Sequence, residues 1–124
     1  MTDPQITAIV EALGAVRMPA QPGEYDIHGQ IAEALKTAHL DFEHEHRLGP
    51  RRRIDFIVGR VGIEVKKGRP AAPALTEQLR RYLASEELDA VIVVTQRALP
   101  LPKTIVGKPV VIVSLNRLWG VALP

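Results

Sequence analysis

Apolar residues recur every three or four positions in three stretches of the chain, and this spacing predicts amphipathic helices. The clearest stretch covers residues 24–38. A short helix is expected within residues 1–20, where Thr2 or Asp3 can act as the N-cap. A later helix is expected over about residues 74–85. Proline and glycine lie between these stretches and separate them.

Shorter segments indicate β-strands. Residues 42–48 alternate with a period near two, and two further strands are expected at residues 54–58 and 61–65. Turns rich in glycine join these three segments, which predicts an antiparallel meander. Residues 89–96 indicate a buried strand, and residues 110–115 indicate a last one.

The expected order is helix, three-strand meander, helix, strand, strand, which defines an α/β fold with a mixed central sheet flanked by helices. The proline-rich residues 99–109 are expected to form a loop. The length suits one domain, so we expect a single unit over residues 1–124. It would comprise an N-terminal helical extension (1–20), a core (24–95) and a C-terminal loop and strand (96–124).

Composition narrows the class of protein. Hydrophobic residues make up 46% of the chain and charged residues 24%, a balance that fits a soluble globular protein. Cysteine is absent, which excludes disulfides, thiolate metal sites and a cysteine nucleophile. We recognise neither a secretory leader nor a long apolar run. We therefore expect a cytoplasmic protein with no membrane partner.

The expected hairpin of residues 54–65 brings charged side chains together. If Gly59 and Arg60 form a two-residue loop, counting back along both strands places Asp55 opposite Glu64. Directly opposed residues have Cβ atoms about 5 Å apart. Lys66 follows two positions after Glu64 and therefore shares its face.

The other face of this hairpin is expected to be apolar throughout. A slip of one residue would move the whole apolar set to the wrong side of the sheet, so burial constrains the register. The apolar set comprises Ile54, Phe56, Val58, Val61, Ile63 and Val65.

Two carboxylates at this distance repel each other, and a divalent cation would relieve the repulsion. Mg²⁺ or Mn²⁺ takes carboxylate oxygens, carbonyls and water, so Asp55, Glu64 and the carbonyl of Val65 are candidate ligands. Lys66 beside such a metal can orient the attacking water and stabilise charge on a phosphate. The alternative is a surface cluster of ion pairs.

Two helical positions are polar where an apolar residue is expected. Glu24 falls on the apolar stripe of its helix, unlike the solvent-side Glu33, and is a further candidate metal ligand. Gln78 lies on the stripe of the later helix and needs a polar partner. The alternatives are a first-turn Glu favoured by the helix dipole and a Gln bonded to solvent. In the first strand either His46 or Glu45 lies beside the site, depending on register.

The combination of Asp55 with Glu64-Val65-Lys66 in this order of elements resembles the PD-(D/E)XK nuclease superfamily, which includes restriction endonucleases and Holliday-junction resolvases. The resemblance covers about residues 24–95. It implies a restriction endonuclease-like core. It also implies that the Asp and the Glu bind metal while the Lys assists the attacking water.

Further positions extend the resemblance. Resolvase-like members carry a Glu on the first core helix at the spacing of Glu24, and Gln78 with Tyr82 resembles the Gln-x-x-x-Tyr motif of several branches. Ile54 stands where the family name has proline, which is a frequent departure. No motif is matched after Gln96.

We therefore expect a DNA nuclease, an endonuclease in the first place, that hydrolyses phosphodiester bonds with metal-activated water. A non-catalytic nucleic-acid-binding or protein-interaction module is the main alternative, and RNA cleavage is a weaker one because aromatic stacking platforms are not evident. We also consider a homodimer, joined through residues 110–119. A solvated basic face would explain the arginines without DNA. The candidate phosphate contacts are Arg51, Arg52, Arg53, Arg80 and Arg81.

Overall fold

The computed structural model describes residues 3–16 and 24–115, and for residues 24–26 it describes the backbone only. Within this part of the chain there are three helices and six strands. In chain order they are α1 (Pro4–Leu13), α2 (Glu24–Thr37), β1 (Glu43–Gly49), β2 (Arg52–Val58), β3 (Val61–Lys66), α3 (Ala72–Leu83), β4 (Ala90–Thr95), β5 (Thr104–Ile105) and β6 (Lys108–Ser114).

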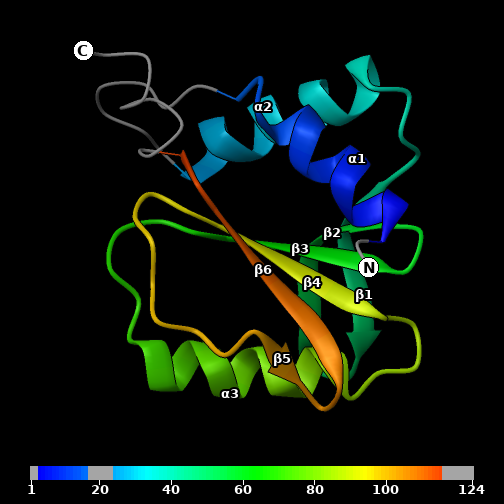
Figure 1. The fold of residues 1–124 in the computed structure, drawn as a ribbon. Helices are drawn as coiled ribbons and strands as arrows, with labels where there is room; N and C mark the ends of the chain where they lie inside the picture. The colour runs from blue at the N-terminus through cyan, green and yellow to red at the C-terminus, as the bar shows by residue number, and fades with distance from the viewer. Residues whose placement is uncertain (1–2, 17–23, 116–124) are drawn as a thin grey trace.

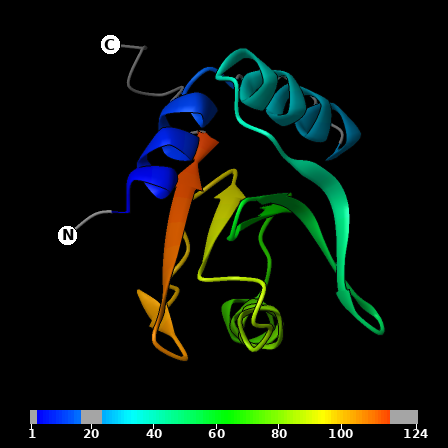
Figure 2. The same ribbon diagram turned by 90° about the vertical axis from the view of Figure 1, so that its right-hand side faces the viewer.

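The strands form one mixed sheet in the order β1-β2-β3-β4-β6-β5. Strands β1, β2 and β3 are the predicted antiparallel meander, β4 and β6 continue it in parallel, and β5 returns antiparallel to β6. The α/β class and the mixed sheet flanked by helices are therefore confirmed. Figure 1 shows the sheet between α1 and α2 on one face and α3 on the other, and Figure 2 shows the same layers after a quarter turn.

One segment differs from the prediction. Residues 99–109 were expected to be a loop, but Thr104 and Ile105 form β5 and pair with Pro109 and Lys108. Val106 and Gly107 make the reversal with φ values of 47° and 77°. Valine seldom adopts a positive φ, so the sequence does not signal this turn.

Each face of the sheet covers its own apolar cluster. The cluster under α1 and α2 includes Ile9, Ile31 and Phe56, and the cluster under α3 includes Leu79 and Val91. The central strand β4 is buried along its whole length, because helices cover both of its faces.

The last strand completes this core. Val110 packs in the α3 cluster, whereas Val113 and Leu115 pack in the other one. These side chains of the segment considered for a homodimer are thus buried within the chain itself, and Leu118 and Trp119 lie outside the described residues. None of the described helices has the length and apolar character needed to cross a membrane.

The facing of side chains changes within β1 and β2. Residues two apart in a strand normally share a face, yet Phe56 lies in the α1 and α2 cluster while Ile54 lies in the α3 cluster. On β1, His44 pairs with Phe56 and His46 with Ile54. Glu45 between them has a φ of 57°. The expectation that Ile54 shares the face of Phe56 is therefore wrong.

Gly62 makes room for this change of facing. A Cβ atom at Gly62 would lie 2.3 Å from Cδ1 of Ile54 and 3.2 Å from Cδ1 of Leu88. Both side chains are fully buried, so neither can move aside without disturbing the close-packed core. Glycine at this position lets Ile54 lie across β3.

We predict that Gly62→Ala lowers the free energy of unfolding by about 1–3 kcal/mol, the usual cost of overfilling a packed core. Denaturant titration measures the change. Gly29→Ala is the matched control, since a Cβ at Gly29 in α2 meets nothing within 4 Å. It should stabilise the helix by up to about 1 kcal/mol. Equal effects of the two substitutions would contradict the steric explanation.

Candidate functional site

Asp55 and Glu64, called here the carboxylate pair, lie where β2 and β3 part. The paired positions run from Val58 with Val61 to Phe56 with Ile63, as the hairpin count predicts. Beyond Phe56 and Ile63 the two backbones are no longer paired, and the side chains of Asp55 and Glu64 approach backbone N–H groups instead. The backbone N–H of Val65 donates to Oδ2 of Asp55 at 2.7 Å, and the N–H of Asp55 lies 3.4 Å from Oε1 of Glu64. The two carboxylates lie close together, as predicted, but Asp55 and Glu64 do not form a pair of the β2–β3 ladder.

Lys66 and Tyr82 contact the same carboxylate from two elements. Nζ of Lys66 lies 3.2 Å from Oε2 of Glu64, as expected for side chains that share a face of β3. The hydroxyl of Tyr82, on α3, lies 3.0 Å from the carbonyl of Arg53 and 3.5 Å from Oε2 of Glu64. Glu64 thus has cationic and neutral donors around it.

Glu64 is only 4% exposed, and this burial has an electrostatic consequence. Burial, followed by the charge of Asp55, raises the pKa of Glu64 to about 7, although Lys66 opposes the rise. Burial and the charge of Glu64 also raise the pKa of the Tyr82 hydroxyl, which therefore stays protonated as a donor. Lys66 alone therefore does not offset the effects of burial and of Asp55 on Glu64.

Gln78 approaches the carboxylate pair through Tyr82. Its Nε2 donates to the hydroxyl of Tyr82 at 2.9 Å, one helical turn along α3. The polar partner that sequence reasoning required for Gln78 is therefore Tyr82. Glu24 begins α2, as predicted for the acid of the first core helix, but its side chain lies outside the described residues.

Two histidines that sequence reasoning did not place here approach from α2 and β1. Nε2 of His28 lies 3.9 Å from Oδ2 of Asp55, and Nδ1 of His28 lies 2.8 Å from Nε2 of His44. The ring of His44 stacks on Phe56 with centroids 4.6 Å apart. One signal was available for His28: it follows Glu24 by four residues, which is one turn of a helix.

The arginines predicted to contact phosphate divide into two groups. Arg51, Arg52 and Arg53 line a hollow of about 400 Å³ together with Arg47, Gln78 and Tyr82, and this is called the arginine hollow below. Arg80 and Arg81 lie instead on the exposed side of α3, where both contact Glu77. The structure therefore brings the first group beside the carboxylate pair and leaves the second apart.

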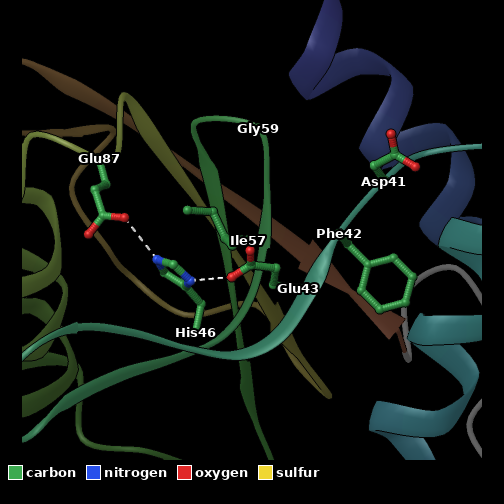
Figure 3. A pocket seen from close by; sticks show the side chains of 7 residues that line it. All are labelled: Asp41, Phe42, Glu43, His46, Ile57, Gly59 and Glu87. Atoms are coloured by element: carbon green, nitrogen blue, oxygen red, sulfur yellow. Dashed lines mark hydrogen bonds and ion pairs between the residues drawn. The ribbon is translucent and has the colours of Figure 1, made fainter.

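Of the two candidates left open by sequence, Glu45 takes the position opposite Asp55, because the residues beside it pair as His44 with Phe56 and His46 with Ile54. Glu45 is exposed and lies 3.7 Å from Arg53. His46 lines another hollow, in which Figure 3 shows its ring between Glu43 and Glu87. The two ring nitrogens lie 2.5 and 2.9 Å from these carboxylates. The change of facing at Glu45 carries His46 to the α3 side of the sheet.

Among the residues that the structure describes, no three His, Asp or Glu side chains are grouped closely enough to hold a metal ion by themselves. A metal ion at the carboxylate pair would have only the side chains of Asp55 and Glu64 from this group as oxygen ligands. A third would have to come from a backbone carbonyl, from water or from Glu24, whose side chain is outside the described part.

Comparison of the chain with models of protein families, with curated proteins and with solved structures yields no match.

We predict that Glu64→Gln stabilises the metal-free protein more at pH 8 than at pH 5. The folded pKa of Glu64 is raised, so its neutral form stabilises the fold at low pH, and that stabilisation is lost as the pH rises through about 7. With about 1.4 kcal/mol for each pKa unit, the difference between the two pH values should be about 1–3 kcal/mol.

Chemical denaturation in EDTA at both pH values measures this difference. Glu33→Gln, on the exposed side of α2, is the matched control and should leave the pH dependence unchanged. A stability gain for Glu64→Gln that is equal at pH 5 and pH 8 would contradict the assignment.

A second pH effect is expected at His46. Hydrogen bonding to Glu87, the largest cause, together with Glu43, raises the pKa of His46 above 6.5 despite partial burial. The protonated ring therefore stabilises the fold below pH 6.5, and the contribution is lost as the pH rises through the raised pKa. NMR titration should find the midpoint of His46 above 6.5, and Glu87→Gln should lower it. A midpoint that Glu87→Gln leaves in place would show that the ion pair does not form.

Proposed function

We propose that this protein is a divalent-metal-dependent DNA nuclease of the PD-(D/E)XK kind, with a restriction endonuclease-like core. The observation that supports it most is the arrangement of Asp55, Glu64 and Lys66. Two carboxylates and an ammonium group converge where β2 and β3 part, and burial next to Asp55 raises the pKa of Glu64 to about 7. Perturbed titratable groups of this type are common at functional sites.

The donor set fits Mg²⁺ or Mn²⁺. Both ions take oxygen ligands, and Asp55 with Glu64 supplies carboxylates whose mutual repulsion a cation would relieve. The carbonyl of Val65 and the side chain of Glu24 are the further ligands we assign. When bound, the metal would lower the pKa of the attacking water and offset charge on the phosphate.

The chain's own residues would do the rest. Lys66 would orient the attacking water and stabilise negative charge that develops on the phosphate oxygens. Tyr82 would hold the side chain of Glu64 through its hydroxyl, and Gln78 would hold the hydroxyl of Tyr82. These two are positioning residues, because Gln78 contacts the hydroxyl of Tyr82, and that hydroxyl contacts Oε2 of Glu64 and the carbonyl of Arg53. Arg51, Arg52 and Arg53 would contact the DNA backbone, whereas Arg80 and Arg81 pair with Glu77 on the exposed side of α3 and receive no role in it.

One observation favours a second candidate, a non-catalytic nucleic-acid-binding module. Asp55 already accepts the N–H of Val65, and Glu64 already pairs with Lys66, so the cluster could serve only to complete the ladder between two strands. Such a module would bind nucleic acid through the arginines without binding metal at the carboxylate pair.

Cleavage of duplex, single-stranded, flap and four-way-junction DNA with Mg²⁺ and with Mn²⁺ tests the proposal. We expect at least one substrate to be cut, and we expect Asp55→Ala and Lys66→Ala each to lower the rate by about 10²-fold or more, the usual effect of removing a group that stabilises the transition state. Lys36→Ala, on the exposed side of α2, is the matched control for lost charge and should cut at the normal rate.

Calorimetry separates the two candidate functions. A nuclease should bind Mg²⁺ or Mn²⁺, and Asp55→Asn should weaken that binding. Failure to cut any DNA, together with metal binding that is absent or unchanged in Asp55→Asn, would favour the non-catalytic module.

A further inference from the structure

The arginine hollow is a second candidate site beside the carboxylate pair. The turn between β1 and β2 forms one side of it, and Gln78 and Tyr82 of α3 form the other. Tyr82 belongs to both sites, because its hydroxyl lies 3.5 Å from Glu64. A group held in the hollow would therefore lie next to the carboxylates.

The backbone brings these arginines together at a cost. Arg47 and Arg53 are direct cross-strand partners, and Arg52 is paired with Gly49 across a register shift. Like charges directly opposite each other in a sheet are destabilising. Arg51 adds a φ of 59° at the turn, a conformation that L side chains other than Asn and Asp seldom adopt.

Little in the protein offsets this positive charge. The lining of the hollow contains no Asp or Glu. Arg53 lies 3.7 Å from Glu45, whereas Arg47, Arg51 and Arg52 have no carboxylate within 4 Å among the described residues. Such a cluster of unpaired guanidinium groups favours an anion in the space between them.

The donors suit a phosphate group. Guanidinium groups offer paired N–H donors that match phosphate oxygens, and the Gln78 amide lines the same hollow. The Tyr82 hydroxyl is not counted among these donors, because it already donates to the carbonyl of Arg53 or to Glu64. A phosphate ester at a strand end carries a charge approaching −2 at neutral pH, since its second pKa is about 6. An internal phosphate carries a single negative charge. The hollow, with a volume of about 400 Å³ between four exposed arginines, has room for one phosphate group, and its concentrated positive charge favours the more highly charged end group.

We propose that the arginine hollow binds the terminal phosphate of a nucleic-acid strand, so that cutting at the carboxylate pair is measured from a strand end. Its placement beside a cutting site depends on the proposed nuclease function, but phosphate binding itself does not. The chemistry is shared by 5′- and 3′-phosphorylated ends, which the experiment distinguishes.

The test compares binding of the full chain to one short DNA duplex in three forms: with 5′-phosphates, with 3′-phosphates and with no terminal phosphate. Fluorescence anisotropy in EDTA at a fixed salt concentration measures binding without cleavage. We expect one phosphorylated form to bind about tenfold more tightly than the unphosphorylated form, in line with charge-assisted hydrogen bonds. Inorganic phosphate should compete for that advantage.

Arg47→Gln and Arg52→Gln should each remove most of this preference. Arg81→Gln, which loses the same charge from the exposed side of α3, is the matched control and should keep it. Thermal unfolding checks that all three variants fold. Equal binding of the three duplexes by the wild-type chain, or loss of the preference in Arg81→Gln as well, would overturn the proposal.

The two proposals can fail separately. An end preference in EDTA without cleavage under any metal would leave the arginine hollow standing and remove the nuclease. Cleavage without an end preference would do the reverse.

Discussion

Strands β2 and β3 part beyond the Phe56–Ile63 pair, next to Asp55 and Glu64, and the rest of the structure depends on this constraint. Strand β3 pairs with β4 from Val61 to Lys66, so it cannot follow β2 away. Where the strands part, the backbone N–H of Val65 has no backbone partner in β2, and the carboxylate of Asp55 accepts its hydrogen bond instead. Buried N–H groups need such a partner. This hydrogen bond to the backbone therefore holds the carboxylate of Asp55 beside Glu64.

The same arrangement sets stability against chemistry. Glu64 is buried beside a second carboxylate, and its raised pKa shows that the folded chain resists its ionisation. An ordinary structural role would be served better by a neutral residue of the same shape. Functional sites often retain groups that weaken the fold. This cost is the physical reason for which we propose a cation site and not a simple cluster of ion pairs.

Much of the fold and of the candidate site could be predicted from the sequence, because both follow from the periodicity of apolar residues and from the lengths of the turns. The helices, the meander and the neighbouring positions of Asp55 and Glu64 all depend on regular spacing. Regular spacing fails in β1, where Glu45 has a left-handed backbone, and in β2, where Ile54 and Phe56 face opposite sides of the sheet. Simple alternation therefore does not predict which face of the sheet is occupied by Ile54, His44 and His46. His28 lies near Asp55 because α2 packs on the sheet. The sequence pattern within a single helix or strand does not show which residues such packing brings together.

The two outer strands of the sheet have a consequence for association between molecules. An exposed edge strand offers unpaired backbone groups that can template aggregation. Here β5 has only two residues. At the opposite edge, β1 is interrupted by the left-handed Glu45 and by a register shift before Gly49, and it alternates acidic residues with histidines. Neither edge presents a long straight strand, so the irregularities that disturb β1 also protect the molecule from sheet-to-sheet polymerisation.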